Sequence, residues 1–380
     1  MTKPSFKPSF KPSFEPSFIP GLELSRHFYF EAVRPLLDEF VPGVAHSAAR
    51  LGSGSEVLGF DTARSADHEW GPRLQLFLHP QDVARHGATI TELLSERLPK
   101  SFRGYPTHFA PAGEADIGVM QTTDGPVHHR VEVTDLGAWF TAQLGFDPRK
   151  DITPADWLAT PTQLLAEVTG GAVFHDGVGR LAPARAALDW YPHDLWLYVL
   201  ACQWQRISQE EAFVGRCGEV GDELGSAVVT GRLVRDVMRL CLLMDRRYPP
   251  YSKWLGSAFA RLPQASSLTP VLTAALAATD WHIREHHLTR AYEIIAATHN
   301  QLGLTDPVDP TTRPYHSRPF QVLHAERFTE ALIARITDPT IGSLSTVGAV
   351  DQFIDSTDVL SRPELTRAAT HVTVSEPPPA

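Results

Sequence analysis

The stretch that decides the fold is Leu51–Leu78, LGSGSEVLGFDTARSADHEWGPRLQLFL. It begins with a small-residue turn, Gly52–Ser55, and after eleven intervening residues reaches Asp67-His68-Glu69 and an apolar run. Successive side chains of a strand alternate between its faces, so a strand here would place Asp67 and Glu69 on one face. Glycine lets a phosphate approach the backbone closely, and paired carboxylates bind divalent metal. The stretch therefore predicts a site for a metal ion and a nucleoside triphosphate.

The spacing of these two halves resembles a known signature. A Gly-Ser pair followed about a dozen residues later by Asp-x-Glu on a strand is similar to the motif of the polymerase-β-like nucleotidyltransferase superfamily. The segments GSEVLGFD, DHEWGPRLQLFL and RRYPPYSKW resemble a bacterial family called domain of unknown function 4037, which is placed in that superfamily. The superfamily motif covers about Leu51–Leu78, and the family resemblance runs from about Gly21 to about Ile336. Glu69 departs from the pattern, because Asp is the commoner residue there.

The resemblance implies a magnesium-dependent nucleotidyltransferase, with Mn²⁺ as the alternative ion. Asp67 and Glu69 would hold the metal on a nucleoside triphosphate, with ATP as the expected donor. A hydroxyl of a small acceptor, antibiotic-like or a metabolite, would attack the α-phosphate and release pyrophosphate. Two alternatives are a toxin-type enzyme that modifies tRNA or protein, and a nucleotide-binding protein that has lost catalysis. The turn residues that would support the phosphates are Gly52, Ser53, Gly54 and Ser55.

A third carboxylate on a neighbouring strand commonly completes sites of this superfamily, as a metal ligand or as the base for the attacking hydroxyl. Two-metal catalysis requires oxygens that bridge ions about 3.5–4 Å apart, so a third acid is chemically reasonable. The sequence HRVEVTDL, His129–Leu136, reads as a strand with Glu132 at its middle. We choose Glu132, with Asp116 and Asp135 as alternatives. An exposed acid on an edge strand would explain Glu132 without any function.

The pattern along residues 21–150 predicts an α+β fold, and the resemblance implies a nucleotidyltransferase-type mixed sheet there. Pro35 is expected to kink the first helix. The expected elements are a helix over Leu22–Phe40, a strand over Val44–Leu51, a short helix from Ser55, a strand through Asp67–Leu78, a helix over 81–97, a strand over Ser101–Ala110, a loop over 111–126 and the strand His129–Leu136.

Composition limits the class of protein. A net charge of −10 and a pI near 5.9 disfavour a general nucleic-acid surface, although a local basic patch stays possible. Cys202, Cys217 and Cys241 have no CxxC spacing and read as reduced core residues of a cytoplasmic protein. No apolar run is long enough to span a membrane, and MTKPSF does not resemble a signal peptide.

Residues 3–18 repeat a tetrapeptide, KPSF three times and then EPSF. Proline at every fourth residue blocks a helix, so we expect residues 1–20 to be a disordered tail. The alternative is a docking peptide that presents its spaced phenylalanines.

The chain changes character after a proline-rich linker at Asp147–Pro161. Residues 151–336 show helical periodicity and predict an all-helical domain, and residues 337–380 predict a partly disordered extension. The expected helices are 193–206, 208–223, 227–246, 250–261, 268–302 and 317–336.

Several residues of the helical domain are candidates for function. Lys253 follows a double-proline turn and could contact the nucleotide as a point charge, whereas Arg246 and Arg247 at a helix end also suit the helix dipole. Glu210 is a possible acceptor-side base, and a capping box with Ser208 explains Glu211. The pairs His282/His286 and Arg318/His324 have the spacing of a zinc motif and a ribonuclease motif, and we interpret both as coincidence.

Overall fold

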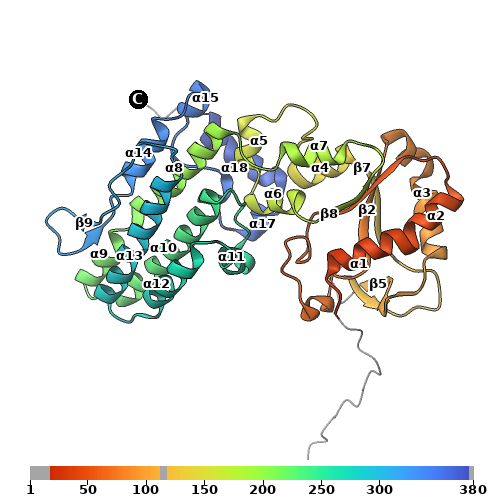
Figure 1. Ribbon diagram of the computed structural model, residues 1–380, viewed down its shortest axis with the longest axis horizontal. Helices are drawn as coiled ribbons and strands as arrows, with labels where there is room; N and C mark the ends of the chain where they lie inside the picture. The colour runs from red at the N-terminus through yellow and green to blue at the C-terminus, as the bar shows by residue number, and fades with distance from the viewer. Residues whose placement is uncertain (1–17, 112–117, 376–380) are drawn as a thin grey trace, which may run out of the picture. The chain divides into compact units, whose positions relative to one another are not determined.

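The computed structural model describes residues 18–111 and 118–375 of the chain (Figure 1). It divides into two compact units: Met1–Leu136 with Gly170–Ala182, and Gly137–Thr169 with Pro183–Ala380. This division differs from the predicted boundary near residue 150, because a segment after the linker returns to the first unit. The repeats before Phe18, and Asp116, lie outside the described residues.

The first unit is built on a four-stranded mixed sheet in the order β7-β2-β1-β8. The strands are β1 (His46–Arg50), β2 (Arg73–Leu78), β7 (Arg130–Asp135) and β8 (Ala172–Asp176). β2 pairs with β7 in parallel and with β1 antiparallel, and β8 pairs antiparallel with β1. The sheet is mixed, and the fold is α+β as predicted. β8 was not predicted, because its sequence AVFHD lies between two helices.

One face of this sheet carries the core of the first unit. Leu74, Leu76 and Leu78 of β2 alternate onto this face and are buried with Ala48 and Val131 of the neighbouring strands. Arg73, Gln75 and Phe77 therefore alternate onto the opposite face of β2.

Three α-helices and one π-helical turn cover the apolar face. The helix predicted for Leu22–Phe40 consists of α1 (Gly21–Phe28), a π-helical turn (Tyr29–Val33) and α2 (Arg34–Phe40), which Figure 1 shows as one rod. Pro35 lies in the first turn of α2, where a missing amide is tolerated, and the irregular turn precedes it. α3 (Pro80–Arg97) matches the predicted helix, and its Ile90 and Leu94 complete the core.

Three predictions in the first unit were wrong. The residues from Ser55 to Gly59 form turns and not a helix. Asp67 ends a 3₁₀ helix, Ala63–Asp67, and the strand begins only at Arg73, so Asp67 and Glu69 do not share a strand face. The strand expected over Ser101–Ala110 is divided by a turn into short strands, and one more lies in the expected loop; these are β3 (Ser101–Phe102), β4 (Tyr105–Pro106), β5 (His108–Pro111) and β6 (Gly118–Gln121).

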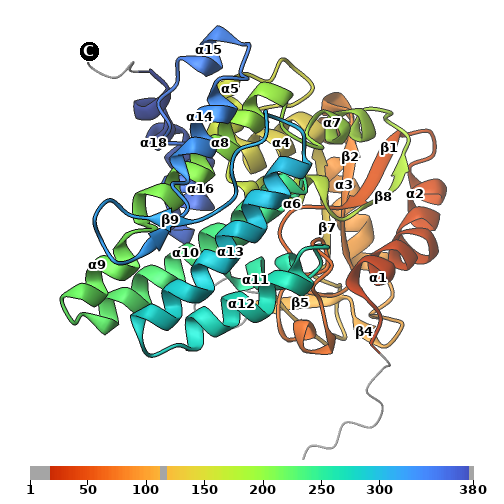
Figure 2. The ribbon, with the colours of Figure 1, turned by 60° about the vertical axis from the view of Figure 1, so that its left-hand side comes forward.

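The second unit is mostly helical, as predicted. Its long helices α8 (His193–Glu210), α10 (Glu223–Met244) and α13 (Trp281–Gln301) lie side by side in both views (Figures 1 and 2). The remaining elements before residue 336 are α4 (Leu136–Leu144), α5 (Pro154–Ala159), α6 (Thr162–Thr169), α7 (Leu181–Ala187), α9 (Phe213–Glu219), α11 (Ser252–Phe259), α12 (Ala265–Ala277), β9 (Arg313–Pro314), β10 (Gln321–Val322) and α14 (Glu326–Ile333).

The predicted C-terminal extension contains short helices in the residues that the structure describes, up to residue 375. It forms α15 (Pro339–Gly342), α16 (Val350–Phe353), α17 (Thr357–Leu360) and α18 (Pro363–Ser375). Gln352 is buried and donates to the Val199 carbonyl at 3.0 Å, and Arg367 binds Asp156 at 2.6 Å. These contacts secure a segment whose polar composition alone suggests a tail.

Among the described helices, none combines the length and the apolar character that crossing a membrane requires.

Candidate functional site

The Gly-Ser turn follows β1 directly, and the Arg50 side chain holds its carbonyl groups. The Arg50 guanidinium donates to the carbonyl oxygens of Leu51 and Ser53. Arg73, at the start of β2, also donates to the Ser53 carbonyl, at 3.4 Å. Gly52 and Gly54 have φ values of 77° and 149°, which favour glycine. Buried arginines thus bind the carbonyl of Leu51, just before the turn, and the carbonyl of Ser53 within it.

Glu56 joins these two arginines beneath the turn. Its Oε1 atom accepts from Arg50 Nε at 2.8 Å, and from Arg73 Nε at 3.0 Å and Nη2 at 2.7 Å. The Glu56 side chain is 2% exposed, so the cluster lies within the protein. Burial acts to raise the pKa of Glu56, but Arg50 and Arg73 outweigh it and the pKa is lowered. The sequence analysis did not predict this cluster. The feature that could have indicated it is an arginine at the end of one strand, Arg50, and another at the start of the next, Arg73.

The backbone amides of the turn are differently placed from its carbonyls. Within residues 18–111 and 118–375, the amides of Ser53, Gly54 and Ser55 donate no hydrogen bond. Ser53 is exposed, and Gly54 and Ser55 are partly exposed. Consecutive amides without acceptors in a tight turn form an anion-binding concavity. These amides can therefore act as donors to an anion, and phosphate binding by the turn stays a prediction.

The two predicted metal ligands have different surroundings. Glu69 Oε1 accepts from the Gly118 amide and lies 3.2 Å from Arg130 Nη2, and Glu69 Oε2 lies 3.6 Å from Arg73 Nη1. Asp67 is 61% exposed, and its carboxylate lies 2.8 Å from Nδ1 of His68. Arg73 therefore links Glu69 to the Gly-Ser turn, whereas no contact described for Asp67 reaches that turn.

Glu132 lies on β7 directly opposite Gln75 of β2. The Gln75 side chain accepts from the Leu51 amide at 3.0 Å and donates to its carbonyl at 3.3 Å, so it connects this part of the sheet to the start of the turn. Exclusion of water by the surrounding protein raises the pKa of Glu132, while Gln75 and Arg50 act in the opposite direction. Asp135 pairs with Leu78, at the other end of the strands.

These carboxylates provide the oxygen ligands that Mg²⁺ prefers, but their arrangement does not fit a shared ion. Glu69 is engaged by two arginines, and Asp67 by His68. In the part of the chain that the structure describes, no three His, Cys, Asp or Glu side chains are grouped closely enough to hold a metal ion. The positions of Asp67, Glu69 and Glu132 support a polar, charged edge of the sheet and not a formed metal centre.

Lys253 lies on α11 in the second unit, and its Nζ is 4.9 Å from the centre of the Trp254 ring. Two hydrogen bonds, one buried and one partly buried, hold the preceding Pro-Pro turn. Thr162 Oγ1 donates to the Pro249 carbonyl at 2.7 Å, and the Gln163 side chain accepts from the Tyr251 amide at 2.9 Å. These contacts give the RRYPPYSKW segment a structural role, and nucleotide binding by Lys253 stays a prediction.

The predicted capping box is absent, because Ser208 lies inside α8. Glu211 instead accepts from the amides of Leu323 and Ala325 at 2.7 and 2.9 Å, and burial raises its pKa to about 7. Glu210 pairs with Arg232 at 2.6 Å.

The remaining candidates also have ordinary partners. His282 lies 3.3 Å from Asp280, and His324 lies 3.1 Å from Glu326. Arg246 is stacked 4.3 Å from the Trp196 ring centre, Arg247 pairs with Asp245 at 2.7 Å, and Arg318 pairs with Glu219 at 2.5 Å.

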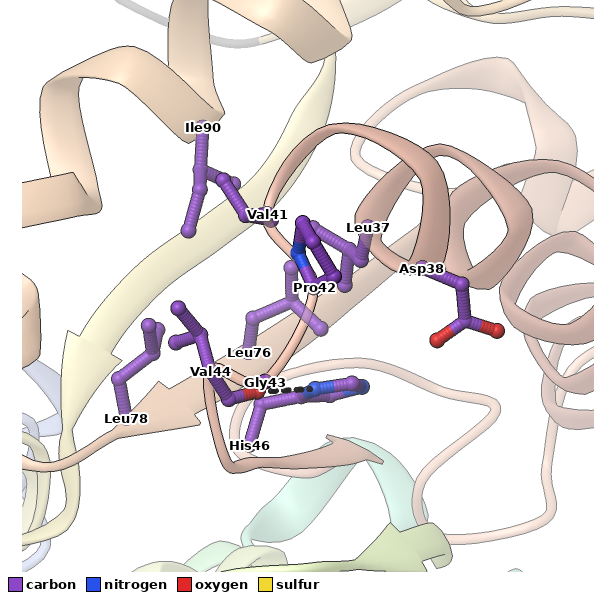
Figure 3. Close-up of a pocket in the computed structure, with 10 residues that line it drawn as sticks. All are labelled: Leu37, Asp38, Val41, Pro42, Gly43, Val44, His46, Leu76, Leu78 and Ile90. Carbon is purple, nitrogen blue, oxygen red and sulfur yellow. Dashed lines mark hydrogen bonds between the residues drawn. The ribbon is translucent and has the colours of Figure 1, made fainter.

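A pocket of about 330 Å³, including open solvent, lies at the other end of β1 and β2 from the Gly-Ser turn (Figure 3). Its lining is mainly apolar and comes from α2, residues 41–44, the start of β1, β2 and α3. The titratable residues in this lining are His46 and Asp38. Tyr29 already bonds the His46 ring at 2.9 Å. This pocket is therefore separate from the predicted site.

Residues 157–255 match a family model described as Domain of unknown function (DUF4037). The matched segment includes β8 and the whole of RRYPPYSKW with Lys253, and it does not include the Gly-Ser turn, Glu69 or Glu132. No curated protein and no solved structure matches the chain. The match supports the predicted resemblance to domain of unknown function 4037 for this part of the protein.

Proposed function

We propose that this protein binds a nucleoside triphosphate at the Gly-Ser turn and transfers its nucleoside monophosphate to a hydroxyl of a small acceptor. The observation that carries the proposal is the turn itself, in which Arg50 engages two carbonyls and three consecutive amides have no described acceptor. A phosphate chain carries the negative oxygens that such amides bind.

The surrounding charges suit the same role. Arg73 and Arg130 lie on neighbouring strands and flank Glu69, so two guanidinium groups are available to a ligand that displaces this carboxylate. Glu132 has a raised pKa and lies near the start of the turn through Gln75, which suits a base for an attacking hydroxyl. The superfamily resemblance names the reaction as nucleotidyl transfer with release of pyrophosphate.

Metal dependence enters only through the resemblance, because the described carboxylates do not fit a shared ion. The acidic net charge favours a small acceptor over tRNA.

Binding of each of the four nucleoside triphosphates and of the corresponding nucleosides tests the proposal. We expect a triphosphate to bind whatever its base, and the corresponding nucleoside not to bind. We also expect transfer of the α-phosphate label to a hydroxylated acceptor, with loss of transfer in Glu132→Gln. Equal binding of nucleoside and triphosphate would contradict phosphate recognition, and triphosphate binding without transfer to any acceptor would favour a nucleotide-binding protein that has lost catalysis.

A matched pair of glycine variants tests the turn. An added Cβ at Gly54 would lie 2.6 Å from Arg50 Nη2, Arg73 Nη2 and Glu56 Oε2, whereas one at Gly43 would meet no atom within 4 Å. Both glycines have positive φ, so both substitutions carry backbone strain. We expect Gly54→Ala to lose triphosphate binding and Gly43→Ala to keep it.

A further inference from the structure

We propose that Arg50 and Glu56 are positioning residues for a condensed-phosphate site, which recognises the phosphate chain of the nucleotide independently of its base. This inference rests on the proposed function, since it names the group that the turn binds and the residues that prepare the turn.

The first step of the argument is the position of Arg50. Its guanidinium reaches the carbonyls of Leu51 and Ser53, while Nε binds Glu56 at 2.8 Å. A planar guanidinium presents its donors in a fixed fork, so it can hold two carbonyls in one orientation. Lysine has the same charge but no such fork. The orientation of the turn therefore depends on the shape of the Arg50 side chain as well as on its charge.

The second step is the position of Glu56. One carboxylate oxygen accepts from both Arg50 and Arg73, and Arg73 reaches the same Ser53 carbonyl. Glu56 thus fixes both arginines relative to the turn. Its negative charge by itself repels a phosphate, so this position opposes binding electrostatically unless positioning outweighs repulsion. Replacing Glu56 by a neutral residue therefore distinguishes the two roles. Weaker phosphate binding would indicate that Glu56 positions the turn, and tighter binding would indicate that it only repels the phosphate.

The third step concerns the ligand. The amides that have no acceptor among the described residues belong to three successive residues, Ser53 to Ser55, and Arg73 and Arg130 continue the positive charge toward Glu69. A series of donors extending from the turn along two strands suits several linked phosphates better than a single one. The contacts involve no group that distinguishes one base from another.

Calorimetric titration of the full chain with inorganic tripolyphosphate, pyrophosphate and phosphate tests this inference. We expect tripolyphosphate to bind most tightly. We expect Arg50→Lys and Glu56→Gln each to raise its Kd at least tenfold. Arg185→Lys is the matched control, because Arg185 also holds two carbonyls, those of Val168 and Thr169, in the other unit. It should change the Kd less than twofold while lowering the thermal midpoint.

Circular dichroism identifies the variants that fold. If Arg50→Lys does not fold, Glu56→Gln still tests the inference. Unchanged or tighter tripolyphosphate binding by a folded Glu56→Gln protein would overturn the inference, as would failure of the wild type to bind tripolyphosphate. Arg50-dependent tripolyphosphate binding without nucleotidyl transfer would sustain the inference and refute the proposed reaction. Nucleotidyl transfer with a KM that Arg50→Lys leaves unchanged would refute the inference and support the proposed reaction.

Discussion

The two turns that the sequence marks as parts of a site differ in how their backbone groups are used. In the Gly-Ser turn, buried arginines engage carbonyls and three amides have no described acceptor. In the RRYPPYSKW turn, the Pro249 carbonyl and the Tyr251 amide both bond to α6 side chains, and the prolines have no amide to offer. The comparison teaches that a loop rich in motif residues is a candidate for ligand binding when its backbone amides lack acceptors. When its backbone groups already have hydrogen-bond partners within the protein, the loop has a structural role.

The largest expected effect is on the buried charges under the first turn. Glu56→Ala leaves Arg50 and Arg73 without their shared carboxylate, and breaking a buried ion pair costs about 3–5 kcal/mol of unfolding free energy. Urea unfolding measures this loss. Glu210→Ala, which removes the more exposed pair with Arg232, should cost less than about 1 kcal/mol. Similar losses in the two variants would show that the cluster does not support the turn.

The pH dependence of stability should also differ between the two units, because the pKa of a buried glutamate is lowered in the first unit, at Glu56, and raised in the second, at Glu211. Burial raises the pKa of Glu211 from 4.5 to about 7, so the folded chain holds a proton that the unfolded chain releases between these values. This contribution to stability is complete below about pH 4.5 and is lost as the pH rises through about 7, on the order of 3 kcal/mol.

Glu56 has a lowered pKa, so its contribution is present above 4.5 and is lost only at lower pH. Comparing the unfolding of the wild type and of Glu211→Gln between pH 5 and 8 therefore isolates Glu211, because other shifted groups, such as His299 with its pKa lowered to about 4, are present in both proteins. We expect a shallower decline in Glu211→Gln than in the wild type, and an identical decline would show that Glu211 is ionised in the folded protein throughout this range.

The second turn can be weakened without touching the first. Thr162→Val removes a hydroxyl that bonds the Pro249 carbonyl and Asp351, and leaving buried polar atoms unpaired costs about 1–3 kcal/mol. Triphosphate affinity should not change. Thermal unfolding with and without the triphosphate measures both quantities, and a loss of affinity in a folded variant would join this turn to the binding function.

The smallest effect is expected at Lys253. If the RRYPPYSKW turn is only structural, Lys253→Gln changes the Kd for the triphosphate by less than about twofold, or about 0.4 kcal/mol. Equilibrium dialysis against the wild type gives the ratio. A tenfold loss of affinity would instead establish the predicted nucleotide contact and remove the distinction between the turns.

Much of the first unit could be predicted because its signals are local. The alternation of Leu74, Leu76 and Leu78 defines β2, and the periodicity of residues 81–97 defines α3. The Gly-Ser turn was likewise evident from residues that permit positive φ. Strand placement failed at Asp67 and Glu69 because the pattern was extended past Gly71-Pro72, where the 3₁₀ helix and a positive φ at Glu69 interrupt it.

The rest of the site depends on contacts between distant segments. Glu56 meets Arg73 across 17 positions of sequence, and Glu69 meets Arg130 across 61. Nothing in the local pattern indicates that Glu69 lies beside Arg73 and Arg130. The C-terminal helices were missed for the same reason, since their order depends on burial of side chains such as Gln352 against α8.

The return of β8 to the sheet affects how this protein is made. Until residues 170–182 leave the ribosome, β1 lacks its outer neighbour, and the Gly171 amide cannot reach the Val57 carbonyl just after the Gly-Ser turn. At about 5–20 residues per second, synthesis from Leu136 to Ala182 takes roughly 2 to 9 s, during which an exposed strand edge can pair wrongly. The unit that begins the chain therefore completes its folding only after part of the second unit has been synthesised.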